Sequence, residues 1–240
     1  MNSLARKIAH LRAILACMIS INTTASNYCV PVSDAQTKIP DGVTILNPDF
    51  KRFLTDSKHT VLPSLGSISN CSELITAITS GVELGEQMER PEFINYSMCL
   101  ASVLVSGGRA FSTSRFELNN AGRQIMGHLD LNLLHSSLAQ RRPSTHYFLS
   151  NFQFKTTQVD PLSVKLVTDY FRYDFDILAT GNFRQSNNGE LLVRFADKAI
   201  TGSYNSVTIL ILSWIPNEDT IQITEAIDFL RSTKIAASCR

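Results

Sequence analysis

The spacing of hydrophobic residues predicts helices in the first half of the chain. Between about residues 48 and 106, apolar positions recur every three or four residues, as on the buried side of a helix. Asn70 and Glu73 stand at capping-box spacing, so we expect a helix to begin there and to run toward Met88. Pro91 suits the first turn of another helix, and the pair Gly107-Gly108 suits its end.

From about residue 109 the apolar spacing changes to alternation, which predicts antiparallel strands with one face toward water. Asn188-Gly189 predicts a two-residue type I′ turn, and 207–215 is apolar enough for a strand in the middle of a sheet. The alternating apolar positions fall in three groups: Ile125, Leu129, Leu131 and Leu133; Phe148, Phe152 and Phe154; Phe171, Tyr173, Phe175 and Ile177.

The end of the chain predicts a closing helix with Asp219 or Thr220 as its cap. The expected fold is therefore α+β: a helical N-terminal part, then an antiparallel meander-like β-sheet, then a closing C-terminal helix. We expect residues 1–21 to form an amphipathic helix or a targeting segment, 22–47 an extended linker, and 48–240 a single α+β domain.

Composition excludes several classes of protein. The 240 residues are 44% hydrophobic and 18% charged with a net charge of +1, which is typical of a globular chain rather than a strongly basic one. Any anionic partner would therefore have to bind a local basic patch. No apolar run in the sequence reaches the length of a membrane-spanning helix.

The first 33 residues contain no Asp or Glu, and three interpretations fit them. They can be a secretory signal cut near residue 25, an organelle transit peptide, or a retained amphipathic helix that packs, docks on a partner or lies on an anionic membrane. Helical spacing favours the retained helix. The stripe consists of Leu4, Ile8, Leu11, Leu15 and Met18.

None of the five cysteines stands at metal-ligand spacing, so the sequence predicts no structural zinc site. Cleavage near residue 25 would leave an even number, as in a secreted protein: Cys29, Cys71, Cys99 and Cys239. Asn70 and Asn95 would then be candidate glycosylation sites of the mature chain.

A search for catalytic and nucleotide-binding motifs finds none, and the sequence predicts no catalytic residue, cofactor or metal. His128 and Asp130 would share one face of a strand, where a carboxylate could orient an imidazole, but the pattern predicts a solvent face. Asp174 and Asp176 are expected to pair with neighbouring Arg or Lys on a wet strand face.

Basic residues after position 108 form a candidate patch for RNA or an anionic membrane, with aromatic residues nearby. Its members are Arg109, Arg115, Arg123, Arg141 and Arg142. The last two precede Ser144 at a spacing that basic-directed kinases accept, so Ser144 is a candidate phosphorylation site.

The segment Lys165–Phe171 resembles, over seven residues and with one insertion, a segment of bornavirus matrix proteins. The resemblance favours self-assembling structural proteins, such as viral assembly proteins, as a class. We therefore expect a non-enzymatic protein that forms homo-oligomers or binds a protein partner, in the cytoplasm or at a membrane surface. One alternative is a secreted or lumenal binding domain. A second is an enzyme whose site shows no motif.

Overall fold

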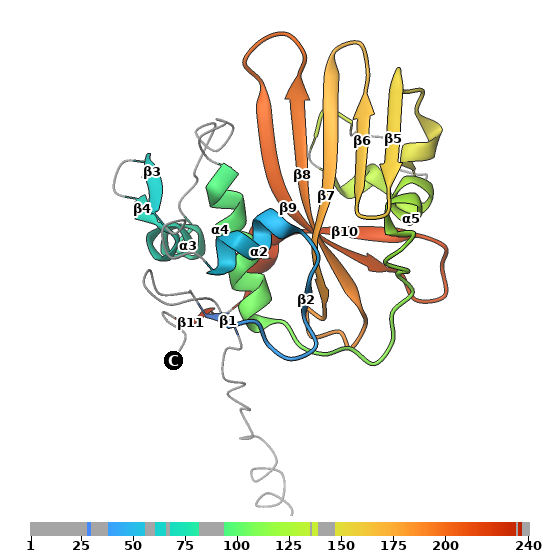
Figure 1. The fold of residues 1–240 in the computed structure, drawn as a ribbon. Coiled ribbons are helices and arrows are strands. Elements are labelled where there is room, and N and C mark those ends of the chain that lie inside the picture. Colours follow the sequence, from blue (N-terminus) through green and yellow to red (C-terminus); the bar gives the residue numbers. More distant parts are fainter. Residues whose placement is uncertain are drawn as a thin grey trace, which may run out of the picture.

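An antiparallel sheet of seven strands forms the centre of the protein (Figure 1). The computed structural model describes residues 28–29, 38–55, 61–65, 68–81, 94–134, 136–138, 147–233 and 235–236. The strands follow the order β10-β9-β8-β7-β6-β5, and β2 pairs with β7. Their bounds are β2 Thr44–Ile45, β5 Thr156–Asp160, β6 Ser163–Val167, β7 Phe171–Gly181, β8 Glu190–Ala199, β9 Asn205–Trp214 and β10 Ile221–Glu225. The predicted α+β class is confirmed.

Helices lie on both faces of the sheet (Figure 1). One hydrophobic cluster joins the sheet to α2 (Pro48–Thr55), α3 (Cys71–Thr79), α4 (Ile94–Gly107) and α6 (Ala226–Ser232). A second cluster on the other face joins it to α5 (Ala121–His128) and the short 3₁₀ helices η4 (Leu131–Leu133) and η5 (Leu149–Asn151). Alternating residues of β7 belong to the second cluster: Tyr173, Phe175 and Ile177 are all buried in it.

The predicted cap of α3 is confirmed, because the Asn70 side chain accepts a hydrogen bond from the Glu73 amide at 3.0 Å. The helix ends at Thr79, however, well before Met88. A disulfide between Cys71 and Cys99 joins its first residue to α4. Helix α4 ends at Gly107, as the glycine pair predicted.

Two pairs of short strands and the short strand β2 were not predicted. β3 (Val61–Leu65) and β4 (Ile68–Asn70) form a hairpin before α3, while β1 (Tyr28–Cys29) pairs in parallel with β11 (Ile235–Ala236). In β2, Thr44 lies opposite Thr180 of β7, so the sheet already begins within the segment expected to be a linker.

Two predicted strands are wrong. Residues 121–128 form α5 and 131–133 form η4, because the buried residues Ala121, Ile125 and Leu129 follow a spacing of four. The expected strand over 148–154 is instead the turn of η5. Period two and period four overlap in both segments, so the alternation alone did not separate them.

The hairpin turn and the closing helix also differ from the prediction. Strand β7 ends at Gly181 and β8 starts at Glu190, so residues 182–189 form a long loop in place of a two-residue turn. Gln185 and Asn187 have positive φ there, whereas Gly189 does not. Residues 221–225 are strand β10, and the last helix starts only at Ala226. Buried Ile221 and Ile223 explain this strand, since they alternate toward the core.

Candidate ligand site

Only some of the residues predicted to form an interaction surface lie in the described part of the chain. Arg109, Arg115 and Arg123 are exposed on the loop before α5 and on α5 itself. Asn70 caps α3, and Asn95 lies in the first turn of α4, where its side chain is not described. Outside the described residues lie Leu4, Ile8, Leu11, Leu15, Met18, Arg141, Arg142 and Ser144.

A pocket of about 140 Å³ lies at one end of the sheet, where three segments meet. Thr113 and Arg115 come from the loop before α5, Asn188 and Gly189 from the loop before β8, and residues 214–217 from the end of β9 and the turn after it. The Gly189 amide donates to the Thr113 carbonyl at 2.7 Å. A Cβ at Gly189 would lie 2.5 Å from the Ser114 side chain, so a glycine permits this approach.

The only tryptophan of the chain, Trp214, forms part of the pocket wall. The guanidinium carbon of Arg115 lies over its ring, and the His128 ring lies at 5.1 Å between centroids. The indole Nε1 of Trp214 is buried and has no hydrogen-bond partner among the described residues. An unsatisfied buried donor costs about 1–3 kcal/mol, and a ligand acceptor that reached it would remove that cost.

The charged groups around Trp214 balance one another. Arg115 donates to the Glu218 carbonyl at 2.7 Å and lies 3.5 Å from an Asp219 carboxylate oxygen. His128 Nδ1 lies 3.3 Å from the other oxygen of Asp219. The possibility that Asp130 orients His128 is not supported: the His128 imidazole contacts Asp219, and Asp130 accepts from the amides of Asn132 and Tyr147.

This arrangement offers polar groups for binding a ligand. Among the described residues no hydroxyl or thiol contacts the His128 imidazole, whose polar contacts are to Asp219. Arg115, Thr113 and the amides of Asn188 and Asn217 offer donors and acceptors to a polar molecule. Because Asp219 already faces Arg115, the site suits a neutral ligand better than a strongly anionic one.

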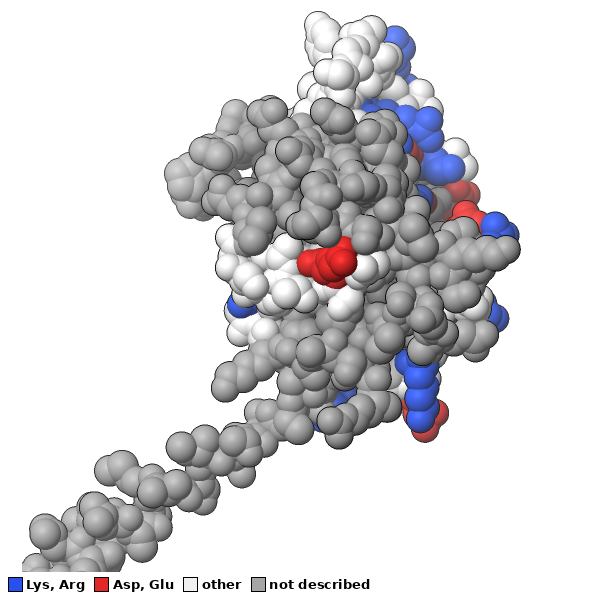
Figure 2. Space-filling view, turned by 90° about the vertical axis from the view of Figure 1, so that its left-hand side faces the viewer, with Lys and Arg blue, Asp and Glu red and all other residues white. Residues whose placement is uncertain are grey.

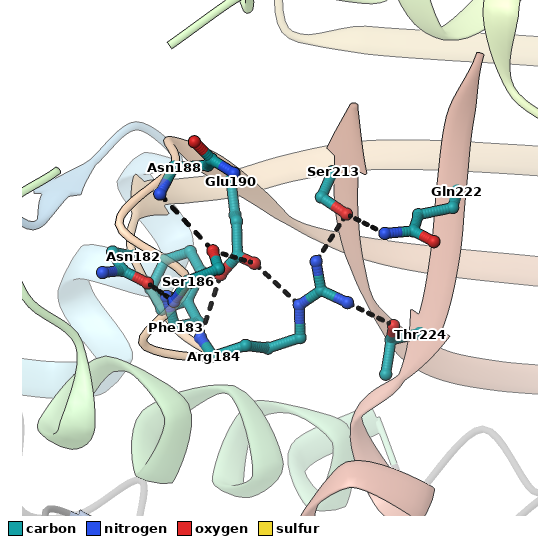
Figure 3. A network of polar contacts seen from close by, with 9 residues as sticks. All are labelled: Asn182, Phe183, Arg184, Ser186, Asn188, Glu190, Ser213, Gln222 and Thr224. Atoms are coloured by element: carbon teal, nitrogen blue, oxygen red, sulfur yellow. Dashed lines mark hydrogen bonds and ion pairs between the residues drawn. The ribbon is translucent and has the colours of Figure 1, made fainter. Parts of the chain in front are cut away.

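A buried ion pair fixes the loop that leads into the pocket (Figure 3). Glu190 is fully buried, and its carboxylate accepts from the Phe183 amide at 2.7 Å, from the Arg184 amide at 2.9 Å and from Arg184 Nε at 2.7 Å. The same guanidinium donates to Thr224 Oγ1 at 2.9 Å and to Ser213 Oγ. Residues 182–189 are thus tied to β9 and β10, which holds Asn188 in place.

Another buried carboxylate fastens residues 136–138 to the sheet. Asp197 accepts from the Ser137 amide at 2.8 Å, from the Ser137 hydroxyl at 3.0 Å and from the Tyr204 hydroxyl at 3.3 Å. Burial raises the pKa of Asp197 against the lowering effect of these hydrogen bonds. Burial likewise raises the pKa of the Tyr173 hydroxyl, which contacts Ser137.

Asp174 and Asp176 of β7 are half-buried and pair with arginines, as predicted. Arg172 Nε lies 3.1 Å from Asp174, and Arg194 Nη2 lies 2.6 Å from Asp176. Each aspartate thus pairs with an arginine, and these ion pairs explain why both carboxylates lie on this strand without a paired-carboxylate active site.

Comparison with protein-family models, curated proteins and solved structures gave no match in any of the three. Among the described residues no three His, Cys, Asp or Glu side chains are placed to hold a metal ion. None of the helices in the described part of the chain is long and apolar enough to cross a membrane.

Proposed function

We propose that the protein is a secreted or lumenal binding domain. The disulfide between Cys71 and Cys99 carries this proposal, since disulfides persist in oxidising compartments and are rare in the cytosol. Its Cα atoms lie 5.4 Å apart, within the normal range for a bridge. Both cysteines are buried in the helical layer, so the bridge belongs to the core of the fold.

Two further features support the proposal. The acid-free first 33 residues, with Arg6, Lys7 and Arg12 before an apolar run, have the composition of an export signal. The pocket beside Trp214 provides a place for a small polar ligand. A neutral sugar fits this chemistry, because amide and hydroxyl groups satisfy its hydroxyls while the indole and Pro216 contact its carbon skeleton.

Processing and disulfide formation test the location. We expect protein purified from its natural host to begin near Ser26 and to retain the bridge, so that Cys71 and Cys99 react with an alkylating reagent only after reduction and unfolding. Intact-mass and peptide mass spectrometry measure both properties. An unprocessed chain whose two thiols react on unfolding without reduction would contradict the proposal.

Ligand binding is tested separately through the emission of Trp214. We expect saturable changes when the full mature chain is titrated with a panel of neutral mono- and disaccharides. Thr113→Val should weaken this response, whereas Thr156→Val, at an exposed position on β5, should leave it unchanged. A flat titration with the whole panel would remove the sugar assignment but leave the compartment proposal standing.

Self-association is the second candidate function, and the edge strand β5 favours it. Four of its five residues are exposed, and an open strand edge is a template for pairing with another chain. Light scattering at two salt concentrations measures the oligomeric state. A monomer under both conditions would exclude this function.

A further inference from the structure

Three large apolar side chains are exposed together at the end of the sheet opposite the pocket. Tyr170 in the β6–β7 turn is 72% exposed, while Ile200 and Tyr204 in the β8–β9 connection are 52% and 36% exposed. The Ile200 amide donates to the Tyr170 carbonyl at 2.8 Å, so the two turns are joined. We name Tyr170, Ile200 and Tyr204 the apex patch. Figure 1 shows its turns projecting beyond helices α2–α4.

The apex patch is held rigidly. The ring of Tyr204 packs edge-on against Phe171 at 6.1 Å, and its hydroxyl donates to the buried Asp197. The Ala199 amide donates to the Tyr204 carbonyl at 3.0 Å, which closes the β8–β9 connection. The exposed apolar side chains are therefore part of an ordered surface rather than of a loose loop, and exposed apolar clusters mark interaction sites.

Basic side chains border the apex patch. Arg172 lies directly opposite Lys198 in the sheet, and each is two residues from an apex side chain. Like charges that face each other across strands are unfavourable. Arg172 is partly balanced by Asp174, whereas Lys198 makes no ion pair with any described residue. Figure 2 shows the top of the molecule as an uncharged surface with Lys and Arg along one side.

We propose that the apex patch docks on an anionic membrane surface. Tyr170, Tyr204 and Ile200 enter the headgroup region, where amphipathic rings are favoured, while Arg172 and Lys198 face lipid phosphates. This chemistry disfavours a second copy, because two apex patches in contact would bring four cations together. It also disfavours RNA, since an aliphatic Ile200 cannot stack on a base as an aromatic ring does.

Vesicle binding tests the proposal with the full chain. We expect co-sedimentation with vesicles of phosphatidylcholine and phosphatidylglycerol, little with phosphatidylcholine alone, and a loss of binding at high salt. The double variant Tyr170→Ser/Ile200→Ser should weaken partitioning by at least about tenfold, and Lys198→Gln should weaken it by about threefold to tenfold. The control is Leu118→Ser, which removes an exposed apolar side chain elsewhere and should bind normally.

The same variants separate the rival partners. Circular dichroism and the emission of Trp214 should show that every variant is folded, since Tyr170, Ile200 and Leu118 are exposed and Lys198 is only half-buried. Equal binding to neutral vesicles, or unchanged binding by the Tyr170→Ser/Ile200→Ser variant, would overturn the proposal. So would a dimer that this variant dissociates, or RNA binding without vesicle binding. None of these results depends on the sugar assignment.

Discussion

The guanidinium carbon of Arg115 lies 4.2 Å from the centroid of the Trp214 ring. This contact joins the loop before α5 to the end of β9, which are distant in sequence. It also places a cation beside the only tryptophan of the chain, so changes at the pocket wall can be followed by tryptophan fluorescence.

We expect Arg115→Ala to alter the emission of Trp214 and to increase its quenching by acrylamide, because the guanidinium no longer covers the ring. The free energy of unfolding should fall by about 0.5–1 kcal/mol, as for a cation–π contact at an exposed site. Fluorescence and urea unfolding measure the two effects. Arg123→Ala on α5 is the control, and an identical response from both variants would contradict the contact.

Replacing Gly122 by Ala should destabilise the protein by at least about 2 kcal/mol. A Cβ there would lie 2.0 Å from the Asp160 carbonyl oxygen, so the helix and the β5–β6 turn must separate. Gly127 lies on the same helix and would meet nothing within 4 Å. Gly127→Ala should therefore stabilise by up to about 1 kcal/mol. Thermal unfolding of both variants measures the difference. Equal effects would contradict the close contact between α5 and the β5–β6 turn.

The double variant Cys71→Ala/Cys99→Ala should lose about 2–4 kcal/mol of unfolding free energy, since the bridge restricts the unfolded chain. Urea unfolding with and without reductant measures the loss. Reductant should shift the wild-type midpoint toward that of the double variant and leave the variant unchanged. If reductant does not move the wild-type midpoint, the bridge is absent.

Glu190→Ala should cost about 3–5 kcal/mol, because it leaves Arg184 partly buried without its carboxylate. The double variant Arg184→Met/Glu190→Met should cost less than Glu190→Ala alone. Asp169→Ala removes the exposed ion pair with Lys155 and should cost no more than about 1 kcal/mol. Equal losses for Glu190→Ala and Asp169→Ala in urea unfolding would mean that Glu190 is not buried as described.

Asp197 should make stability depend on pH. Burial raises its pKa in the folded state above the ordinary value of 3.8. Its contribution to stability is therefore fully present below pH 3.8 and is lost as the pH rises through the folded-state pKa.

Asp197→Asn lacks this titration, so its stability relative to wild type should rise as the pH increases from 3.8 through the raised folded-state pKa of Asp197. The rise is about 1.4 kcal/mol for every tenfold difference in proton affinity between the folded and unfolded states. Urea unfolding at several pH values measures the trend. Asp228→Asn, at an exposed position on α6, is the control. A difference that stays constant with pH would contradict the raised pKa.

The fold class was predictable because the apolar spacing is mostly helical before about residue 109 and mostly alternating after it, and each spacing places the apolar side chains on one face of a helix or of a strand. The Asn70 cap was predictable for the same reason, since donor and acceptor are three residues apart. Segment 121–133 was not, because Leu129 fits both a spacing of four from Ile125 and a spacing of two to Leu131. Only packing against the sheet decides between them.

The candidate site was predictable only in part. Arg115 was expected at a surface that binds a partner, but its neighbours Trp214 and Asp219 lie about a hundred residues later, and no local pattern joins them. Glu190 follows Asn188-Gly189, a sequence typical of an exposed turn, so its burial could not be foreseen. The one feature of the sequence that pointed to the candidate site was the single tryptophan of the chain.

The pairing of β1 with β11 has a consequence for the moment at which the protein folds. Tyr28 lies opposite Ile235, and Thr44 lies opposite Thr180, so early segments are completed by strands made much later. Contacts of such long sequence separation form slowly and only once both partners are present. A chain threaded through a translocation channel from its N-terminal side would thus leave β1 without its partner strand until the region around residue 235 emerged.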